Sequence, residues 1–367
     1  MDRLSEWELH CQDGRIRAVE VEGGRSLELK EPVSIQSPAG FLKFRDRPYR
    51  EELQVHSVGS FCEVVNHVAV EKYLDGLVNS EFNSKWNEES IGAQVVYGVV
   101  GLKTHAKMLL VTRREGKQMR RYGHLSTGNY NPLTAKLYTD ISHLTADPML
   151  TADMEAVFVH MASQSKLPKL NRMWLAPFDL HKNLVAQIDL LAIAAAKGEP
   201  TRIVAKMNAL TDEALIAALV KAGQAGVKID LIVRGACTLP AQVPGLTENI
   251  RVRSVIGRFL EHSRVFYFRS GEDESLYLSS ADWMNRNMMR RIELAWPVTD
   301  PVLRQRLIDE CLVAYLHDGR DAWDLGPDGA YVRIRRDTHA AEQGASRIVE
   351  ADGAQAALMN RYASRGL

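Results

Sequence analysis

The stretch that decides the organisation of the chain is GLKTHAKMLLVTRREGKQMRRYGHLSTGNYN, residues 101–131, because a related stretch returns at residues 257–287, GRFLEHSRVFYFRSGEDESLYLSSADWMNRN. Each copy has a histidine, a cation two residues later, an apolar run and then a small polar cluster. The two pairs are His105 with Lys107 and His262 with Arg264. Side chains alternate between the faces of a strand, so each pair is predicted to share one face. Two such strands could form one anion site.

Length and composition indicate a globular protein with more than one domain. The chain has 367 residues, a length that exceeds what one hydrophobic core usually serves. Of these residues, 46% are hydrophobic and 25% are charged, as is typical of a globular protein. No run of about 18 apolar residues is present, and MDRLSEWELH at the start lacks the pattern of a secretory signal. The cysteines are scattered without CxxC spacing, which favours reduced thiols in the cytoplasm and no zinc site. They are Cys11, Cys62, Cys237 and Cys311.

Charge is balanced overall but clustered locally. The formal net charge of zero argues against a protein that coats nucleic acid. Such clusters ordinarily form solvated faces, but their recurrence beside both histidine motifs favours an anion site. The clusters are Arg113, Arg114, Lys117, Arg120 and Arg121 in the first copy, and Arg286, Arg290 and Arg291 in the second.

The pattern is weakest over residues 1–91 and becomes clearer from residue 93. Residues 14–35 alternate around Gly23-Gly24 like a β-hairpin, whereas apolar spacing over residues 61–86 is compatible with a helix. Strands are then expected at residues 93–100, 102–114 and 119–127, with a turn at Glu115-Gly116, followed by a helix from Thr151 capped by Thr and Asp groups.

The second half alternates strands and helices. A helix over residues 180–198, a strand, a helix capped by Thr211 and a second strand predict a βαβ unit. Lys206 and Arg234 end its two strands, where open α/β sheets collect ligands. Further elements are expected at residues 249–256, 262–268 and 275–280 (strands), at 300–316 (a helix), and at 332–367 (an Ala-rich polar tail forming a mobile extension or an isolated helix).

The repeated motif suits phosphoryl transfer. A neutral imidazole can attack phosphorus and carry the phosphoryl group, while a second imidazole handles the proton at the leaving or entering oxygen. Cations stabilise the equatorial oxygens, and the candidates are Lys107, Arg264, Arg234 and Lys206. A lone histidine on a strand is usually structural, but the recurrence favours catalysis for His105 and His262. His124 stays open between a structural role, a place in the same site and phosphate acceptance. By spacing alone, Tyr138 and Asp140 are loop residues.

Residues 97–115, 120–148, 204–268 and 276–298 carry a family resemblance. The duplicated histidine and cation pattern is similar to the phospholipase D superfamily. The four stretches together resemble, more specifically, the two C-terminal catalytic domains of bacterial polyphosphate kinase, over about residues 92–331. The resemblance implies an α/β fold of two phospholipase D-like domains related by internal duplication.

The resemblance also implies roles for single residues. His105 in THAK matches the phosphorylated histidine of the family, and His262 in EHSR matches its partner in acid–base work and ATP contact. Tyr138 in LYTD and Arg234 in IVRG match nucleotide-binding positions, and Asp140 matches a residue near Mg²⁺. The implied reaction is reversible transfer of the ATP γ-phosphate to inorganic polyphosphate, with ATP/ADP as ligands. A homo-oligomer is expected, and peripheral membrane association is left open.

The chain departs from the family pattern at its start. The family has an N-terminal domain and a head domain ahead of the catalytic pair, and the first catalytic domain should open with its own strand–helix–strand. The predicted organisation is therefore an unrecognised segment (1–91), an incomplete first catalytic domain (92–172), a second catalytic domain (173–331) and the tail (332–367). A new gene start or a shifted reading frame would explain the first segment. The alternatives to a kinase are a phospholipase D-like phosphodiesterase or nuclease, and an inactive remnant that binds polyphosphate or pairs subunits.

Overall fold

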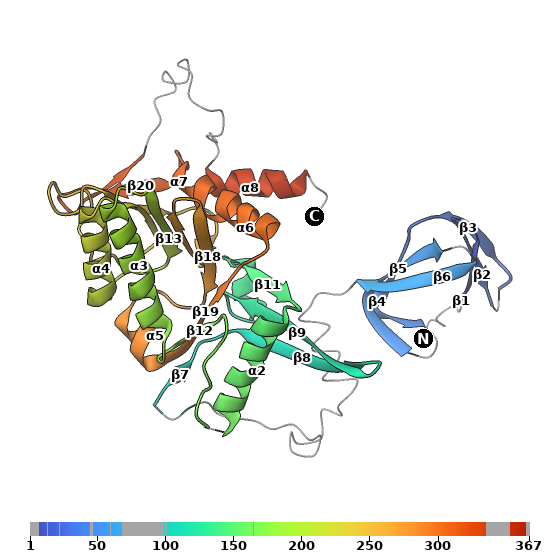
Figure 1. Cartoon of the computed structure of the whole chain (residues 1–367). Helices are drawn as coiled ribbons and strands as arrows, with labels where there is room; N and C mark the ends of the chain where they lie inside the picture. The colour runs from blue at the N-terminus through green and yellow to red at the C-terminus, as the bar shows by residue number, and fades with distance from the viewer. Residues whose placement is uncertain are drawn as a thin grey trace. The chain divides into compact units, whose positions relative to one another are not determined.

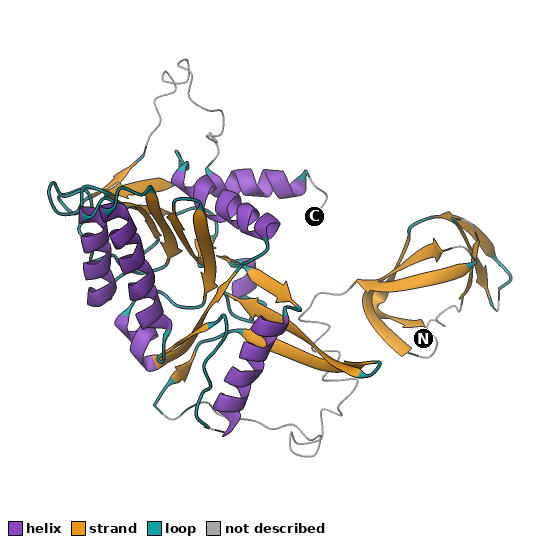
Figure 2. Cartoon of the chain, in the orientation of Figure 1, coloured by secondary structure: helices purple, strands orange, loops and turns teal. Residues whose placement is uncertain are grey.

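A computed structural model gives the structure of the chain as two compact units, Met1–Val95 and Val96–Leu367 (Figure 1). It describes residues 7–12, 14–21, 23–44, 47–58, 60–67, 99, 101–163, 165–334 and 353–364. Strands and helices are mixed in the second unit (Figure 2), so the predicted α/β class is confirmed. Within the described ranges, no helix combines the length and the apolar character needed to cross a membrane.

The described residues of the first unit form two antiparallel three-stranded sheets, ordered β1-β2-β3 and β4-β5-β6. Val19 pairs with Ser26 across the turn at Gly23-Gly24, which confirms the predicted hairpin. The helix expected from Phe61 is wrong at its start, because Phe61–His67 is a strand paired with β5, and residues 68–86 lie outside the described part. The strands are β1 Trp7–Gln12, β2 Arg15–Glu20, β3 Ser26–Lys30, β4 Val33–Phe44, β5 Arg47–Val58 and β6 Phe61–His67.

A small core and a disulfide join these two sheets. Ile16 and Val55 are fully buried between them. Cys11 of β1 and Cys62 of β6 form a disulfide across 51 residues of sequence. The prediction of reduced thiols is therefore wrong for these two residues, because tertiary folding pairs cysteines that carry no local spacing signal. Cys237 and Cys311 are free.

A sheet of ten described strands forms the centre of the second unit, in the order β12-β19-β18-β17-β13-β14-β15-β20-β21 with β7 beside β19. Strand β13, helix α4 (Glu213–Gln224) and strand β14 form the predicted βαβ unit, since the two strands pair in parallel. The strands are β7 Lys103–Thr104, β12 Trp174–Ala176, β13 Thr201–Met207, β14 Lys228–Val233, β15 Ile250–Val255, β17 Arg264–Ser270, β18 Asp273–Ser279, β19 Arg291–Pro297, β20 Ala322–Leu325 and β21 Tyr331–Arg333.

Helices cover both faces of this sheet. Phe266 of β17 faces α4 and α3 (Leu180–Ala196), which lie side by side in Figure 1. Tyr267, one residue on, faces the opposite core with a helical segment made of α6 (Pro301–Leu307), a π-helical turn (Ile308–Val313) and α7 (Ala314–Leu316). This segment confirms the helix predicted over 300–316, and alternation along β17 explains the two cores.

Helix starts agree with the sequence to within a few residues. Asp212, rather than Thr211, caps α4, since its carboxylate accepts the Leu215 amide at 3.0 Å. The helix expected from Thr151 begins at Pro148, where Asp147 accepts the Leu150 amide at 2.8 Å (α2, Pro148–Ser163). Carboxylates at these positions satisfy amides that have no partner within the helix.

The region of the first histidine forms a smaller sheet, ordered β11-β9-β8. Glu115 pairs with Gln118, which confirms the predicted turn. The continuous strand expected over 102–114 is wrong, because it breaks between Thr104 and Met108; the strand expected over 93–100 lies almost wholly outside the described residues. The elements are β8 Met108–Glu115, β9 Gln118–Ser126, a 3-10 turn Thr134–Lys136, β10 Tyr138–Thr139 and β11 Ser142–Thr145.

The C-terminal tail contains a helix that packs against the second unit. Helix α8 (Ala354–Ala363) buries Ala354 and Gln355, which are 1% and 6% exposed. The prediction of a mobile extension or an isolated helix is therefore wrong for α8, and residues 335–352 lie outside the described part. Two further short elements lie in the described part of this unit: β16 Leu260–Glu261 and α5 Asn285–Arg290.

Candidate active site

His105 lies in the break between β7 and β8, where the backbone forms hydrogen bonds with β19. The His105 and Ala106 amides both donate to the Ile292 carbonyl, at 3.0 and 2.9 Å. The His105 Nδ1 atom lies 2.8 Å from Oε2 of Glu293, whose side chain is fully buried. A carboxylate accepts hydrogen bonds, so Nδ1 is the donor, and in a neutral imidazole this arrangement places the lone pair on Nε2.

Glu293 is held by two further donors. Ser280 Oγ donates to Oε2, and Asn287 Nδ2 donates to Oε1, each at 2.6 Å. A buried carboxylate with donors on both oxygens is fixed in orientation, and it fixes the imidazole in turn. Sequence reasoning missed Glu293.

His262 forms a second pair of the same kind with Asp140. Its Nδ1 atom lies 2.9 and 3.0 Å from the two Asp140 oxygens, and Thr127 Oγ1 donates to the same carboxylate at 2.8 Å. Burial lowers the pKa of His262, and its hydrogen bond with Asp140 opposes this. A Cβ atom at Gly128 would lie 2.0 Å from an Asp140 oxygen, so the glycine of the STGN cluster makes room for the carboxylate. The Tyr138 and His262 rings lie 4.9 Å apart between centroids.

The two pairs repeat each other. Thr127 and Asp140 are 13 residues apart, as are Ser280 and Glu293, and in each case a hydroxyl of the small polar cluster donates to the carboxylate. Extending the repeat past each small polar cluster to the next acidic residue would therefore have found Glu293. Each histidine binds the carboxylate that belongs to the other copy of the repeat.

Lys107 lies within electrostatic reach of both pairs. It is 6% exposed, and its Nζ atom has no hydrogen-bond partner among the described residues. Burial lowers its pKa to about 8, against the opposing charges of Glu293 and Asp140. A buried ammonium without a partner is costly, so this position suits an anionic ligand.

Arg264 is also buried, but its guanidinium group already pairs with Asp282. Nε and Nη2 donate to Asp282 at 3.1 and 3.0 Å, while Nη1 lies 3.2 Å from His262 Nε2 and donates to the Thr127 carbonyl at 3.2 Å. Burial alone would raise the pKa of Asp282, but Arg264 holds it below its usual range. Arg264 therefore links the loop of the first copy to the histidine of the second.

The two cations at the βαβ strand exits differ. The Nε atom of Arg234 donates to the Glu261 carbonyl at 2.8 Å and to Asn208 Oδ1 at 3.2 Å, beside His262. Lys206 is 2% exposed, and its Nζ atom donates to Glu261 Oε2 at 2.6 Å. The prediction that Lys206 binds a ligand anion is therefore wrong, because a buried carboxylate already pairs with it.

His124 contacts neither histidine pair. Its Nδ1 atom lies 2.8 Å from the Tyr130 hydroxyl, and burial lowers its pKa. Among the described residues, no group of three or more His, Cys, Asp or Glu side chains could hold a metal ion. Asp140 is therefore a single carboxylate, engaged by His262 and Thr127.

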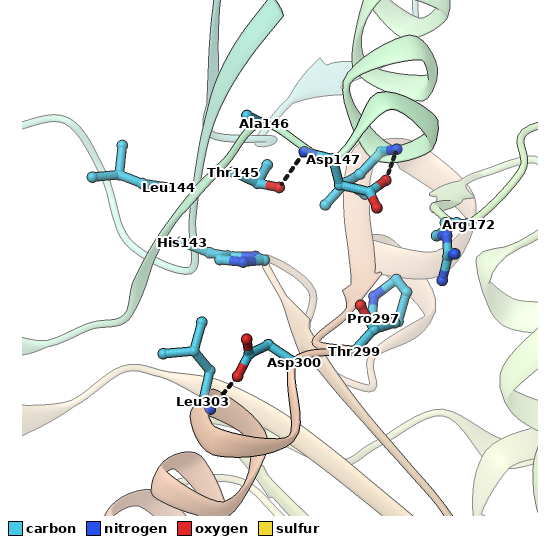
Figure 3. A pocket seen from close by; sticks show the side chains of 11 residues that line it. His143, Leu144, Thr145, Ala146, Asp147, Arg172, Pro297, Thr299, Asp300 and Leu303 are labelled. Atoms are coloured by element: carbon cyan, nitrogen blue, oxygen red, sulfur yellow. Dashed lines mark hydrogen bonds between the residues drawn. The ribbon is translucent and has the colours of Figure 1, made fainter.

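A pocket of about 250 Å³ lies elsewhere, beside β11 and the starts of α2 and α6 (Figure 3). His143 points into it, and Asp147, Arg172 and Asp300 line it. Its lining includes none of the predicted site residues.

Known proteins resemble both copies of the repeat. The family model described as polyphosphate kinase C-terminal domain 1 matches residues 60–167, and that of C-terminal domain 2 matches residues 173–345. The first match begins within residues 1–91, the segment for which the sequence pattern predicts no known domain.

Relatives and a solved structure agree with these matches. Polyphosphate kinase of Xylella fastidiosa (strain Temecula1) is 48% identical over 263 residues, 71% of this chain and 38% of the relative. That of Pseudomonas aeruginosa (strain PAO1) is 50% identical over 264 residues, 69% of this chain and 38% of the relative. The crystal structure of polyphosphate kinase from Porphyromonas gingivalis superposes with a TM-score of 0.69 at 30% identity, covering 82% of this chain and 47% of that one. The chain spans less than two fifths of the length of these curated relatives, and through its two C-terminal domains it belongs to the polyphosphate kinase family.

Proposed function

We propose that the chain carries a polyphosphate kinase active site in which His105 accepts the γ-phosphate of ATP and passes it to inorganic polyphosphate, reversibly. The observation that carries the proposal is the contact of His105 Nδ1 with buried Glu293, which leaves Nε2 as the nucleophile. The relatives are named polyphosphate kinase, which supports the choice of substrates.

The proposed reaction has two displacements. The Nε2 lone pair attacks the γ-phosphorus, the bond from phosphorus to the bridging oxygen breaks, and ADP leaves with the electron pair. A terminal oxygen of polyphosphate then attacks the same phosphorus, and the bond to Nε2 breaks. His262, oriented by Asp140, donates a proton to the leaving oxygen or accepts one from the entering oxygen.

Four further residues are proposed to bind the phosphates and the nucleotide. Lys107 supplies an ammonium whose Nζ atom has no hydrogen-bond partner among the described residues. Arg264 adds a buried positive charge beside His262 Nε2, which favours the charge of the transferring group. Tyr138 is proposed to contact the nucleotide beside His262, and Arg234 to bind phosphate through its terminal nitrogens, since its described contacts use only Nε.

Asp140 is proposed to hold Mg²⁺ together with ATP. One carboxylate is a small donor set, but Mg²⁺ is commonly bound by one or two carboxylates with substrate phosphates. The donors present therefore fit a metal that arrives with the nucleotide, and its chemistry there is to neutralise phosphate charge.

The basic hairpin β8–β9 is proposed to guide polyphosphate. Arg113 and Arg120 are 67% and 59% exposed in their side chains, with the single carboxylate of Glu115 between them. A polyanion is attracted to such a surface in a salt-dependent manner.

Labelled ATP tests the proposal. Incubation with Mg²⁺ and [γ-³²P]ATP should give an acid-labile, base-stable label that is lost in His105→Ala and kept in His160→Ala, a control on α2. Cleavage of phosphodiesters without label would support the phosphodiesterase alternative. Retention of polyphosphate without label would support the inactive remnant, and either result would reject the kinase.

A further inference from the structure

The C-terminal helix α8 reaches the loop that carries His262. Its Gln355 side chain accepts the Phe259 amide at 2.8 Å through Oε1 and donates to the Phe259 carbonyl at 2.9 Å through Nε2. The side-chain amide thus binds both backbone groups of one residue, as a neighbouring strand would. Phe259 directly precedes β16, and His262 directly follows β16.

Gln355 also joins a buried ion pair. Its Nε2 atom donates to Oε1 of Glu261, which is 3% exposed. The same carboxylate accepts from Tyr315 at 3.0 Å, from Lys206 at 2.6 Å and from Thr139 at 2.8 Å. Both oxygens are therefore satisfied, and the network fixes Glu261 in one position.

The segment that Gln355 binds connects the two copies of the repeat. Strand β16 pairs in parallel with β10, aligning Leu260 with Tyr138, and the His262 amide donates to the Thr139 carbonyl at 3.3 Å. A shift of Phe259 or Glu261 would therefore move His262 relative to Asp140, the residue after β10.

We propose that Gln355 is a positioning residue, which holds Phe259 and Glu261 so that His262 and the loop of Tyr138 meet in register. The inference rests on the proposed function for its effect on turnover. It extends the site to a helix beyond residue 345, where the match to the second domain model ends.

Helix α8 has separate anchors at its two ends, which supplies a matched control. Its first amide, that of Ala354, donates to Asp318 Oδ2 at 2.8 Å, and the Tyr362 hydroxyl donates to Glu310 Oε2 at 2.5 Å. Tyr362→Phe removes a hydrogen bond that holds α8 but contacts neither Phe259 nor Glu261.

The main variant is Gln355→Met, which keeps the side-chain length and removes the amide. We expect kcat for ATP-dependent phosphoryl transfer to fall about 10- to 100-fold with KM for ATP within about twofold, since misplacing a group by about 1 Å has effects of that size. Tyr362→Phe should leave both constants unchanged. Hydrogen exchange of the amides at residues 259–262 should accelerate in Gln355→Met and not in Tyr362→Phe.

Gly257→Ala approaches the same contact from the other side. A Cβ atom at Gly257 would lie 2.5 Å from Gln355 Oε1, so the added methyl group should displace the amide. The two substitutions remove the same interaction, so kcat of the double variant should be no lower than kcat of the less active single variant. Additive losses would overturn the assignment.

The readouts separate failure of the inference from failure of the proposed function. If the wild-type chain is active but Gln355→Met has normal exchange at 259–262 or normal kcat, Gln355 is not a positioning residue. If the wild-type chain is inactive, faster exchange in Gln355→Met and not in Tyr362→Phe still supports the mechanical link. If Gln355→Met releases α8 from the second unit, the proposal requires that exchange at residues 259–262 also becomes faster. Release of α8 with unchanged exchange at these residues would overturn the proposal.

Discussion

Replacing Glu293 by Gln tests the proposal that Glu293 makes His105 a nucleophile. The substitution keeps the shape of a fully buried side chain and removes its charge. Glu293 accepts from His105 and Ser280 on one oxygen and from Asn287 on the other. Gln can accept on one side only, so its amide nitrogen has to face either His105 or Asn287.

The structure favours the second arrangement. The Asn287 Oδ1 atom is buried without a hydrogen-bond partner among the described residues, so a flip of the Asn287 amide would let it accept from the new amide nitrogen. His105 Nδ1 would then still donate to an oxygen, now an uncharged one. Hydrogen bonds to charged groups contribute about 1.5–3 kcal/mol and neutral ones about 0.5–1.5 kcal/mol. A difference of about 1.4 kcal/mol in the transition state lowers the rate about tenfold.

Rapid-quench measurement of the first turnover with [γ-³²P]ATP would show the effect. The rate of labelling at His105 should fall at least about tenfold in Glu293→Gln, and the free energy of unfolding should stay within about 1 kcal/mol. If the Gln amide nitrogen faced His105 instead, the proton would move to Nε2 and the loss would be far larger, about 10⁴-fold in the comparable Asp→Asn change of a serine protease. Ser280→Ala is the comparison variant, because it removes one donor to Glu293 but keeps the charge that faces His105, so the labelling rate should fall less than in Glu293→Gln. Labelling of Glu293→Gln within twofold of the wild type would refute the reasoning.

Three other substitutions test charge, burial and covalent linkage. Burial lowers the pKa of Lys107 to about 8, so its ammonium loses its charge as the pH rises past about 8. In steady-state assays, KM for ATP should therefore rise above this pH in the wild type, whereas Lys107→Arg should give a KM that does not change with pH. Lys206→Met leaves the Glu261 charge buried and unpaired, and urea unfolding should show a loss of about 3–5 kcal/mol that the added change Glu261→Gln partly restores. Cys62→Ser removes the disulfide with Cys11, which spans 51 residues, and should lower the free energy of unfolding of the first unit by about 4 kcal/mol. Limited proteolysis during heating would detect this loss, and equal melting with and without the disulfide would contradict the prediction.

Local patterns were enough to predict most elements of the second unit. The turn after Glu115 was predictable because glycine favours turn conformations with a positive φ, and Gly116 has a φ of 60° in the structure. The βαβ unit followed from apolar periodicity between turn residues, and β13 and β14 pair in parallel as that pattern requires. In each case, the residues that determine the structure are neighbours in sequence.

Long-range contacts explain what the sequence did not reveal. The strand around His105 breaks because its backbone binds Ile292, and the imidazole meets Glu293 at a separation of 188 residues. Lys206 resembled an exposed ligand cation at a strand exit, but Glu261, 55 residues away, pairs with it in the interior. Strand periodicity alone identifies neither partner.

The crosswise arrangement of the carboxylates shows why neither copy of the repeat forms a site alone. His105 of the first copy depends on Glu293 of the second, and His262 of the second depends on Asp140 of the first. The backbone pairings that join the copies, β7 with β19 and β10 with β16, lie directly beside these contacts. Separating the copies would leave Glu293 buried without its imidazole and His262 without the carboxylate that orients it. Each histidine pair therefore forms only where the two copies of the repeat pack against each other.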